Sequence, residues 1–235
     1  MVGLILQVDS LTVSFDGFKA IDNLDFYVDQ DELRCVIGPN GAGKTKPTSG
    51  NIRFKNYELT EMIEYQITRA GVGRKFQNPS VYEDLTVAEN LDISWPKKRN
   101  VLGSLFFRRN RAMADKIDTV ASQIFLRDQL NTKSGLLSHG QKQWLEIGML
   151  LMQDPELLLL DEPVAGMSAR EREKTAELLS SISKGRSTVV IEHDMAFVRM
   201  IAHKVTVLHQ GKLLAEGSMD EVQSDPRVVE SYLGH

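Results

Sequence analysis

The sequence has little of several features that define other classes of protein. It contains one cysteine in 235 residues, so it holds no internal disulfide and no cysteine-based zinc cluster. Its 28 Lys and Arg residues are outnumbered by 32 Asp and Glu residues, and the net charge of -4 argues against the basic field of a nucleic-acid-binding protein. The longest apolar runs fall far short of the roughly 20 residues that cross a bilayer, and no charged-then-apolar leader opens the chain. The composition therefore predicts a globular protein that neither spans a membrane nor is exported.

Short apolar runs without polar alternation indicate strands inside a parallel sheet. Leu33–Ile37, Leu157–Leu160 and Thr188–Ile191 are such runs. In the first thirty residues, by contrast, apolar and polar residues alternate, as is typical of antiparallel strands. The lone Cys35 lies in the first apolar run, where we expect an inert, buried thiol in a reducing cytoplasm.

Helical periodicity fills much of the remaining sequence, and a hairpin is expected near its end. The helical stretches are Glu173–Ser183, Met195–Ala202 and Met219–Ser224, and the hairpin strands are Val205–Leu208 and Lys212–Ala215. The fold class is therefore α/β, with a mostly parallel central sheet and an N-terminal antiparallel β subdomain.

The middle of the chain has few strand signals. Capping boxes predict that helices begin after Thr86 and after Ser138. We expect residues 78–153 to form a helical subdomain inserted into a core made of residues 1–77 and 154–235, all within a single domain.

The loop after the strand Leu33–Ile37 has the composition of a phosphate-binding loop. It matches the pattern G-x-x-x-x-G-K-[ST], and the strand before it disfavours the alternative of a plain glycine-rich turn. Glycines let the backbone turn its N–H groups toward phosphate oxygens, the lysine adds a charge at the β- and γ-phosphates, and the threonine hydroxyl can ligate Mg²⁺. The eight residues are Gly38, Pro39, Asn40, Gly41, Ala42, Gly43, Lys44 and Thr45. These residues predict a P-loop NTPase core.

Two of the other predicted strands end in ionisable residues. Asp161 and Glu162 follow Leu157–Leu160, and His193 lies two positions after Thr188–Ile191. Parallel sheets bind ligands at the carboxyl ends of their strands, so these side chains are expected near the phosphate loop. Asp161 would hold Mg²⁺ through its water shell, Glu162 would polarise the water that attacks the γ-phosphate, and His193 would hydrogen-bond that phosphate. The alternative is that all three are ordinary solvated residues.

The stretch Leu137-Ser138-His139-Gly140-Gln141 resembles the signature motif of ABC transporter ATP-binding subunits, and the resemblance extends over essentially the whole chain. Ser138 is expected to cap a helix, so that its hydroxyl, the Gly140 backbone and the helix N-terminus form an anion site beside Gln141. In the family this site closes on the γ-phosphate held by a second subunit. The resemblance therefore implies two ATP molecules sandwiched in a head-to-tail dimer. An ordinary capped helix explains everything except the Gly-Gln pair.

The resemblance implies roles for further residues. Phe15 stands where the family has an aromatic that stacks on adenine, although the strand alternation equally allows a core position. Gln77 matches the glutamine that contacts Mg²⁺ and the attacking water. Ser168 replaces a familiar aspartate, which leaves the dimer contact there open; capping a helix through Glu171 is its other role. The catalytic set is then Glu162, His193 and Gln77, and the Mg²⁺ ligands are Thr45, Gln77 and Asp161.

The residues of three segments most resemble those of the ATP-binding subunits of branched-chain amino acid and urea importers, and the urea type is the closer match. These segments are Arg74–Pro79, Glu162–Met167 and Glu192–Met195. The resemblance implies a peripheral ATPase on the cytoplasmic face of the inner (plasma) membrane that powers uptake of a small polar solute. Its implied partners are a second ATP-binding subunit, two transmembrane permease subunits and, indirectly, a solute-binding protein, with no nucleic acid. The alternatives are a soluble non-transport ABC ATPase and a hydrolysis-deficient ATP-binding assembly subunit.

One departure from the family follows Thr45. A phosphate loop normally opens a helix, about ten or more residues long, whose N-terminus points at the phosphates. Here Thr45 runs into Lys46–Gly50, which resembles the turn that follows such a helix. Either a disordered helix is omitted from the sequence, or the helix is truly absent and the cassette is crippled. The first account is favoured because every other motif is intact, and it predicts a chain break between Thr45 and Lys46.

Overall fold

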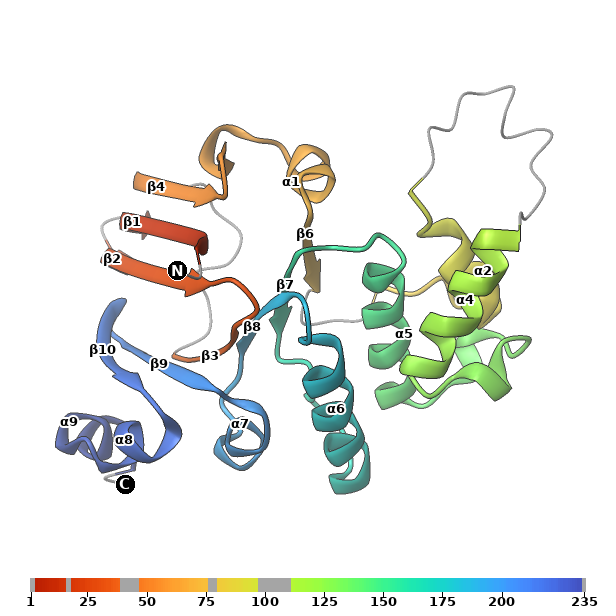
Figure 1. The fold of residues 1–235 in the computed structure, drawn as a ribbon. Helices are drawn as coiled ribbons and strands as arrows, with labels where there is room; N and C mark the ends of the chain where they lie inside the picture. Colours follow the sequence, from red (N-terminus) through yellow and green to blue (C-terminus); the bar gives the residue numbers. More distant parts are fainter. Residues whose placement is uncertain (1–2, 16–17, 39–46, 76–79, 97–110, 234–235) are drawn as a thin grey trace.

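The fold combines two β-sheets with helices (Figure 1), and the computed structural model describes residues 3–15, 18–38, 47–75, 80–96 and 111–233. Sheet A is antiparallel with the order β2-β1-β4-β5, and sheet B has the order β10-β9-β3-β8-β7-β6. The strands of sheet A are β1 (Leu4–Phe15), β2 (Phe18–Asp29), β4 (Ser49–Phe54) and β5 (Tyr57–Glu58). The strands of sheet B are β3 (Leu33–Ile37), β6 (Val72–Lys75), β7 (Leu157–Asp161), β8 (Ser187–Ile191), β9 (Lys204–His209) and β10 (Lys212–Gly217).

Helices connect and cover these strands. The α-helices are α1 (Glu64–Ala70), α2 (Val87–Ile93), α4 (Arg111–Gln123), α5 (His139–Leu151), α6 (Ala169–Ile182), α7 (Met195–Ile201), α8 (Met219–Ser224) and α9 (Pro226–Val228). Short turns of other helix types are η1 (Leu59–Glu61), η2 (Arg127–Gln129), η3 (Ser134–Leu136) and η4 (Val229–Leu233).

The pairing within sheet B confirms the predicted fold class. Strand β3 pairs in parallel with both β8 and β9, and β7 pairs in parallel with both β8 and β6. Only the hairpin strand β10 runs antiparallel, against β9, among the strands of this sheet that the structure describes. The N-terminal alternation is confirmed as the antiparallel pair β1 and β2.

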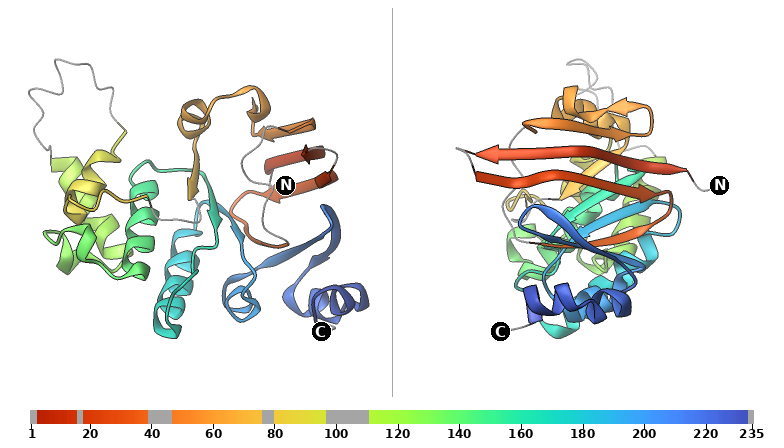
Figure 2. Two further views of the ribbon diagram at one scale, coloured as in Figure 1. Left: turned by 180° about the vertical axis from the view of Figure 1, so that it is seen from behind. Right: turned by 90° about the vertical axis from the view of Figure 1, so that its left-hand side faces the viewer.

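Alternate residues of sheet B face two different hydrophobic cores. Leu158 and Leu160 of β7 pack in a core with residues of α5, α6 and α7, whereas Leu157 and Leu159 pack in a second core with sheet A. This follows from the two-residue period of a strand, which sends neighbouring side chains to opposite faces. Figure 2 shows the same layering, with sheet A and the helices α6 and α7 on opposite sides of sheet B.

The single cysteine is inert in this packing, as predicted. Cys35 is fully buried on β3 and has no disulfide partner. Burial, followed by the nearby Glu192 carboxylate, raises the pKa of its thiol to about 12. The side chain therefore stays protonated and acts as a small apolar group of the core.

The predicted helical middle of the chain contains α2, α4 and α5 among its described residues. Both capping boxes are confirmed: the Thr86 side chain accepts from the Glu89 N–H, and the Ser138 side chain accepts from the Gln141 N–H. In Figure 1, α5 lies between sheet B and the helices α2 and α4. The boundaries at residues 78 and 153 stay a prediction.

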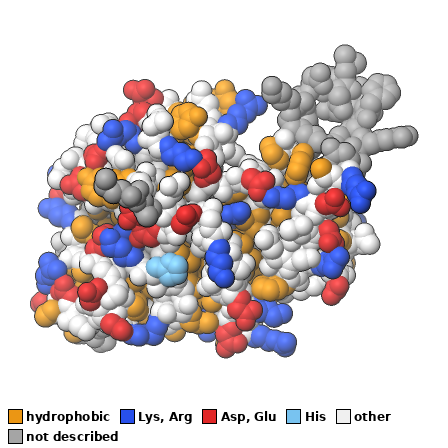
Figure 3. Space-filling model, viewed as in Figure 1, with side chains coloured by type: hydrophobic (Ala, Val, Ile, Leu, Met, Phe, Trp, Pro, Cys, Tyr) orange, Lys and Arg blue, Asp and Glu red, His pale blue; other side chains and the backbone are white. Residues whose placement is uncertain are grey.

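Helix length and surface charge both bear on contact with a membrane. Among the described residues, every helix is too short or too polar to cross a bilayer. On the face drawn in Figure 3, acidic and basic side chains are interspersed.

The helix expected after Thr45 is absent from the chain. The full sequence of 235 residues is continuous from Thr45 to Lys46, so the account in which a helix was omitted from the sequence is wrong. The described chain resumes at Pro47, and β4 begins two residues later at Ser49. The Thr48 N–H donates to the carbonyl of Thr12 on β1 at 2.8 Å. The predicted break at residues 45 and 46 lies outside the described residues.

Candidate nucleotide site

The carboxyl ends of β3, β7 and β8, which we call the carboxyl edge, are joined by backbone hydrogen bonds. The Glu162 N–H donates to the carbonyl of Ile191 at 3.0 Å, and the Glu192 N–H donates to the carbonyl of Val36 at 3.1 Å. Asp161 pairs with Ile191 in the sheet register. The residues that follow β7 and β8 are therefore held next to each other, beside the strand that leads into the phosphate loop.

Glu162 and His193 meet at this edge. The Glu162 Oε1 lies 3.2 Å from the His193 Nδ1, with Glu162 only 4% exposed and the His193 side chain 71% exposed. Glu162 has a φ of 42°, a left-handed conformation that is costly for a residue with a side chain. The fold thus holds a buried carboxylate in a strained position beside an imidazole that solvent and ligands can reach.

A third acid, Glu192, organises both loops and was not singled out by the sequence. Its Oε1 accepts from the Val164 N–H at 3.3 Å, and its Oε2 accepts from the N–H groups of His193 at 3.0 Å and Asp194 at 3.3 Å. Burial raises the pKa of Glu192, and these backbone hydrogen bonds oppose that rise. The signal available in the sequence was an acid placed directly between a buried strand and the histidine.

Asp161 is the one expected Mg²⁺ ligand within the described residues. It ends β7 and is partly buried, and burial followed by the Glu162 charge raises its pKa. A single carboxylate fits a cation that takes its other oxygen ligands from water and phosphate. No cluster of three or more acidic, His or Cys side chains suited to a metal ion is found among the described residues. The other two expected ligands, Thr45 and Gln77, lie outside them.

A buried ion pair lies behind Asp161. Lys75 on β6 places its Nζ 3.7 Å from Glu146 Oε2 on α5 and 3.5 Å from the Asp161 carbonyl oxygen. Burial lowers the pKa of Lys75 and raises that of Glu146, while the opposite charge of the partner counteracts both shifts. The pair could not be predicted from the sequence, because the two residues are far apart along the chain.

The signature helix α5 begins at an anion-binding geometry that already holds a carboxylate. Ser138 Oγ donates to Glu171 Oε1 at 3.0 Å, and Glu171 Oε2 accepts from the Ser168 N–H and hydroxyl. A Cβ on Gly140 would lie 2.5 Å from Glu171 Oε1, so a side chain at this position would displace the Glu171 carboxylate from the start of α5. The hydrogen bonds from Ser168, ahead of that from Ser138, lower the pKa of Glu171. Ser168 caps α6 through Glu171, as predicted, and Gln141 completes the capping box of α5.

Of the remaining expected site residues, Phe15 and Gly38 lie within the described parts of the chain and the others lie outside them. Phe15 ends β1 opposite Phe18 and is 37% exposed, so the alternative core position is wrong; its stacking on adenine stays a prediction. Gly38 directly follows β3. Residues 39–45 of the phosphate loop and Gln77 lie outside the described residues, so their roles stay predictions.

Comparisons with known proteins decide the family. The sequence profile described as ABC transporter matches residues 21–165, which is more than half of the chain. The high-affinity branched-chain amino acid transport ATP-binding protein BraF of Pseudomonas aeruginosa is 33% identical over 98% of this chain and 98% of its own length. The chain belongs to the ABC transporter family. The ATP-binding cassettes of this family are ATPases coupled to transport.

Further matches to this ABC family member span the same length. The probable branched-chain amino acid transport ATP-binding protein LivG of Methanocaldococcus jannaschii is 31% identical, over 98% of this chain and 97% of its own. A crystal structure of the ADP conformation of an ATP-binding cassette of an ABC transporter superposes with a TM-score of 0.84 at 29% identity, covering 99% of this chain and 100% of that one. A profile described as Branched-chain amino acid ATP-binding cassette transporter matches residues 212–235.

The match to BraF also measures what this chain lacks. It extends over 249 residues, whereas this chain has 235. At least 14 positions, the difference between those two lengths, therefore have no residue in this chain.

Proposed function

We propose that the chain is the ATP-binding and ATP-hydrolysing subunit of an importer that takes up a small polar solute through partner membrane subunits. The observation that carries the proposal is the 3.2 Å approach of Glu162 to His193 where neighbouring parallel strands end. A buried acid and an accessible imidazole at that edge suit the hydrolysis of a phosphate placed between them and the phosphate loop.

Each residue of the carboxyl edge then has a chemical role. Glu162 accepts a hydrogen bond from the attacking water and raises its nucleophilicity. His193, whose Nδ1 is engaged by Glu162, uses its Nε2 to hydrogen-bond the γ-phosphate. Glu192 does not touch the nucleotide in this proposal; it fixes the backbone of both loops.

The phosphates and the metal are assigned to residues around this edge. The glycine-rich loop of Gly38–Thr45 would wrap the phosphates, with Lys44 adding charge. Asp161, Thr45 and Gln77 would hold Mg²⁺, which neutralises the charge that develops on the phosphate oxygens. Ser138, Gly140 and Gln141 would bind the γ-phosphate held by a second subunit, and in that dimer Ser138 exchanges Glu171 for a phosphate oxygen.

A branched-chain amino acid is favoured over urea as the transported solute. The support is the named function of the 33% and 31% identical relatives and the profile that matches residues 212–235. The subunit would lie on the cytoplasmic face of the membrane, bound to two permease subunits that receive solute from a binding protein. We assign the permease contact to the turn around Tyr82, whose side chain is exposed and whose backbone is held by Asn90.

The proposal is tested on the complex purified with its membrane subunits. We expect ATP hydrolysis that is stimulated by a branched-chain amino acid with its binding protein, and weaker ATP binding in Lys44→Ala because a phosphate charge partner is lost. Stimulation by urea alone would reassign the solute. Failure to co-purify with any membrane protein, with full ATPase activity retained, would favour a soluble non-transport ATPase.

A second candidate is a hydrolysis-deficient, ATP-binding assembly subunit. The absence of a helix after Thr45 favours it, because the phosphates lose a helix N-terminus and its backbone donors. The two candidates differ in one measurement. A wild-type hydrolysis rate no higher than that of Glu162→Gln, in a complex that still assembles, would select the assembly subunit.

A further inference from the structure

The peptide group that joins Asp161 to Glu162 is held at both of its polar atoms. Its N–H, which belongs to Glu162, donates to the carbonyl of Ile191 at 3.0 Å. Its carbonyl oxygen, which belongs to Asp161, lies 3.5 Å from the Nζ of Lys75. Lys75 is fully buried, so this contact forms away from water, where the attraction between an ammonium and a carbonyl dipole is strong.

The conformation of Glu162 depends on the orientation of this peptide. The φ of Glu162 is 42°, and φ measures the rotation of a residue relative to the peptide that precedes it. The next residue is Pro163, and a proline normally restricts the residue before it to extended conformations with negative φ. A backbone strained in this way persists only where the surrounding structure over-determines it. The contacts of the preceding peptide with Ile191 and Lys75 supply that constraint.

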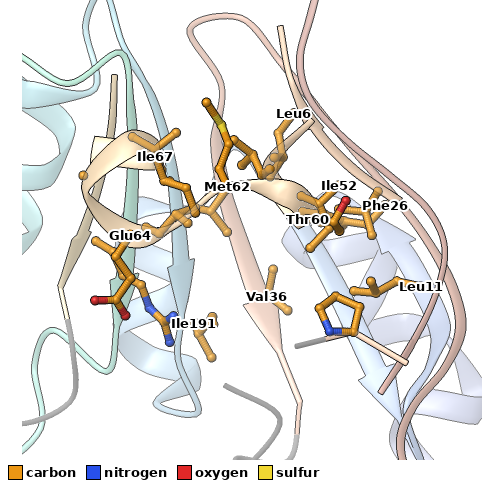
Figure 4. Close-up of a pocket in the computed structure, with 18 of the residues that line it drawn as sticks. Leu6, Leu11, Phe26, Val36, Ile52, Thr60, Met62, Glu64, Ile67 and Ile191 are labelled. Carbon is orange, nitrogen blue, oxygen red and sulfur yellow. The ribbon is translucent and has the colours of Figure 1, made fainter. Parts of the chain in front are cut away.

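Lys75 reaches this peptide from the last position of β6. Neighbouring residues of a strand face opposite sides of the sheet. Arg74 lines an apolar groove of about 830 Å³ between the two sheets (Figure 4), whereas Lys75 faces α5. On α5, Glu146 Oε2 lies 3.7 Å from the Lys75 Nζ, and Glu146 Oε1 accepts from the Ser80 N–H at 3.3 Å. The ammonium is thus placed between a carboxylate of α5 and the end of β7.

Packing alone does not account for a lysine at this position. Burial lowers the pKa of Lys75, so the charged form is costly inside the protein, and the Glu146 charge and then the Asp161 charge offset that cost. A buried ion pair can generally be replaced by apolar side chains of similar volume without loss of stability. The lysine is therefore better explained by what its ammonium contacts, which is the backbone directly before Glu162.

We infer that Lys75 is a positioning residue for Glu162. Its ammonium, held by Glu146, fixes the plane of the peptide that precedes Glu162, and this directs the Glu162 carboxylate toward His193. Lys75 itself touches neither the nucleotide nor the attacking water. This inference rests on the role proposed above for Glu162 in hydrolysis, but its effect on the peptide can be measured without any turnover.

Amide hydrogen exchange, followed by NMR on the full chain, tests the peptide directly. Lys75→Met combined with Glu146→Leu removes the ammonium without leaving a charge buried, so Tm is expected to stay within about 3 °C of the wild-type value. The Glu162 N–H should nevertheless exchange about tenfold faster in this double variant, because the peptide that carries it loses one of its two contacts. The Val189 N–H, in the middle of β8, should keep its exchange rate. Equal protection of the Glu162 N–H in both proteins would overturn the inference.

ATP hydrolysis, measured on the complex with its membrane subunits, adds the functional readout. The double variant is expected to lose about tenfold in kcat, because a small misplacement of a catalytic group lowers the rate, while its affinity for ATP stays within about twofold. In a chain that also carries Glu162→Gln, the same two substitutions should lower the residual rate by less than about twofold, because a positioning residue acts only through the group it positions. An equal further loss in that background would contradict the inference.

Lys116→Met is the matched control. Lys116 pairs with Asp154 at 2.5 Å, just before β7 begins and therefore at the opposite end of that strand from Glu162. This variant is expected to change neither kcat nor the exchange of the Glu162 N–H. Changes as large as those of the double variant would show that losing any lysine pair next to β7 loosens the strand, and would overturn the specific role of Lys75.

The inference and the proposed function fail in different ways. If the wild-type complex hydrolyses ATP no faster than Glu162→Gln, the proposed function fails, and the exchange rate of the Glu162 N–H still decides whether Lys75 fixes the peptide. If wild-type hydrolysis is normal and the double variant keeps its kcat, the proposed function stands and the positioning role is wrong.

Discussion

The carboxyl edge and the apolar groove between the two sheets, which is lined by Val36, Leu159 and Val189 among others, are neighbouring parts of sheet B. They differ in how completely their side chains are paired or packed against other residues. At the carboxyl edge, Glu192 accepts three backbone hydrogen bonds and Glu162 meets His193. In the groove, Val36 and Val189 face a cavity of about 830 Å³. The contacts of the carboxyl edge are complete because they are made by the loops that directly follow the strands. The groove lies where apolar side chains of β3, β7 and β8 face the space between the two sheets.

The largest expected effect is a loss of ATP turnover, and it tests the role of Glu162 at the carboxyl edge. Glu162→Gln keeps the shape of the side chain but removes the carboxylate, so we expect turnover to fall by about 10²–10⁴-fold while ATP binding is retained. Steady-state ATPase assays and ATP-binding titrations measure the two effects separately. Glu173→Gln, at an exposed position of α6, is the matched control and should keep its activity. Normal turnover in Glu162→Gln would refute the role assigned to this carboxylate.

The next-largest expected effect is a loss of stability when the buried ion pair of Lys75 and Glu146, behind the carboxyl edge, is broken. Glu146→Ala removes the carboxylate that lies 3.7 Å from the buried Lys75 ammonium, so we expect a loss of about 3–5 kcal/mol in the free energy of unfolding. Replacing both residues, as Lys75→Met with Glu146→Leu, should restore stability to within about 1 kcal/mol, because no charge then remains buried. Denaturant unfolding measures both variants. A single variant as stable as the double variant would show that the pair is not tightly coupled.

Adjacent leucines of β7 compare the two faces of the sheet directly. Leu160 packs in the core with the helices and is almost fully buried, whereas Leu159 lines the groove. We expect Leu160→Ala to cost about 2–5 kcal/mol in unfolding free energy and Leu159→Ala about 1 kcal/mol, because truncation next to an open cavity removes fewer contacts. Equal losses would mean that the groove is filled in solution.

The smallest expected effect is a pH dependence at the edge. Asp194 caps α7 by accepting from the Phe197 N–H, and this bond, together with Arg172, lowers its pKa from 3.8. Its stabilising contribution is therefore present above pH 3.8 and is lost as the pH falls through the lowered folded-state value. Asp194→Asn keeps a cap but has no titrating charge, so its unfolding free energy should fall less between pH 5 and pH 2, by about 1 kcal/mol or less.

Denaturant titrations across that pH range measure the difference. Asp220→Asn, at an exposed position of α8, is the control and should follow the wild-type pH dependence more closely. An Asp194→Asn variant that loses as much stability in acid as the wild type would contradict the assignment.

Local patterns determined much of the fold. The apolar runs of β3, β7 and β8 and the capping boxes at Thr86 and Ser138 are confirmed because strand burial and helix caps depend on residues within a few positions of one another. Strand β6 was not predicted, since its four residues include Gly73 and two basic side chains that give no apolar pattern. Its place at the sheet edge depends on pairing with β7, more than eighty residues later, from Val72 against Leu157.

The sequence by itself determined which residues follow the strands, and thereby Asp161, Glu162 and His193 as candidates. It also determined that no helix-length segment separates Thr45 from β4. Only the tertiary structure decided that Glu192 accepts N–H groups from two loops, that Lys75 pairs with Glu146, and that Glu171 reaches Ser138. These contacts join residues distant in sequence, and their geometry depends on how the strands and helices pack. The groove has the same origin, because its lining combines residues of sheet A, sheet B and α1 that are far apart in the sequence.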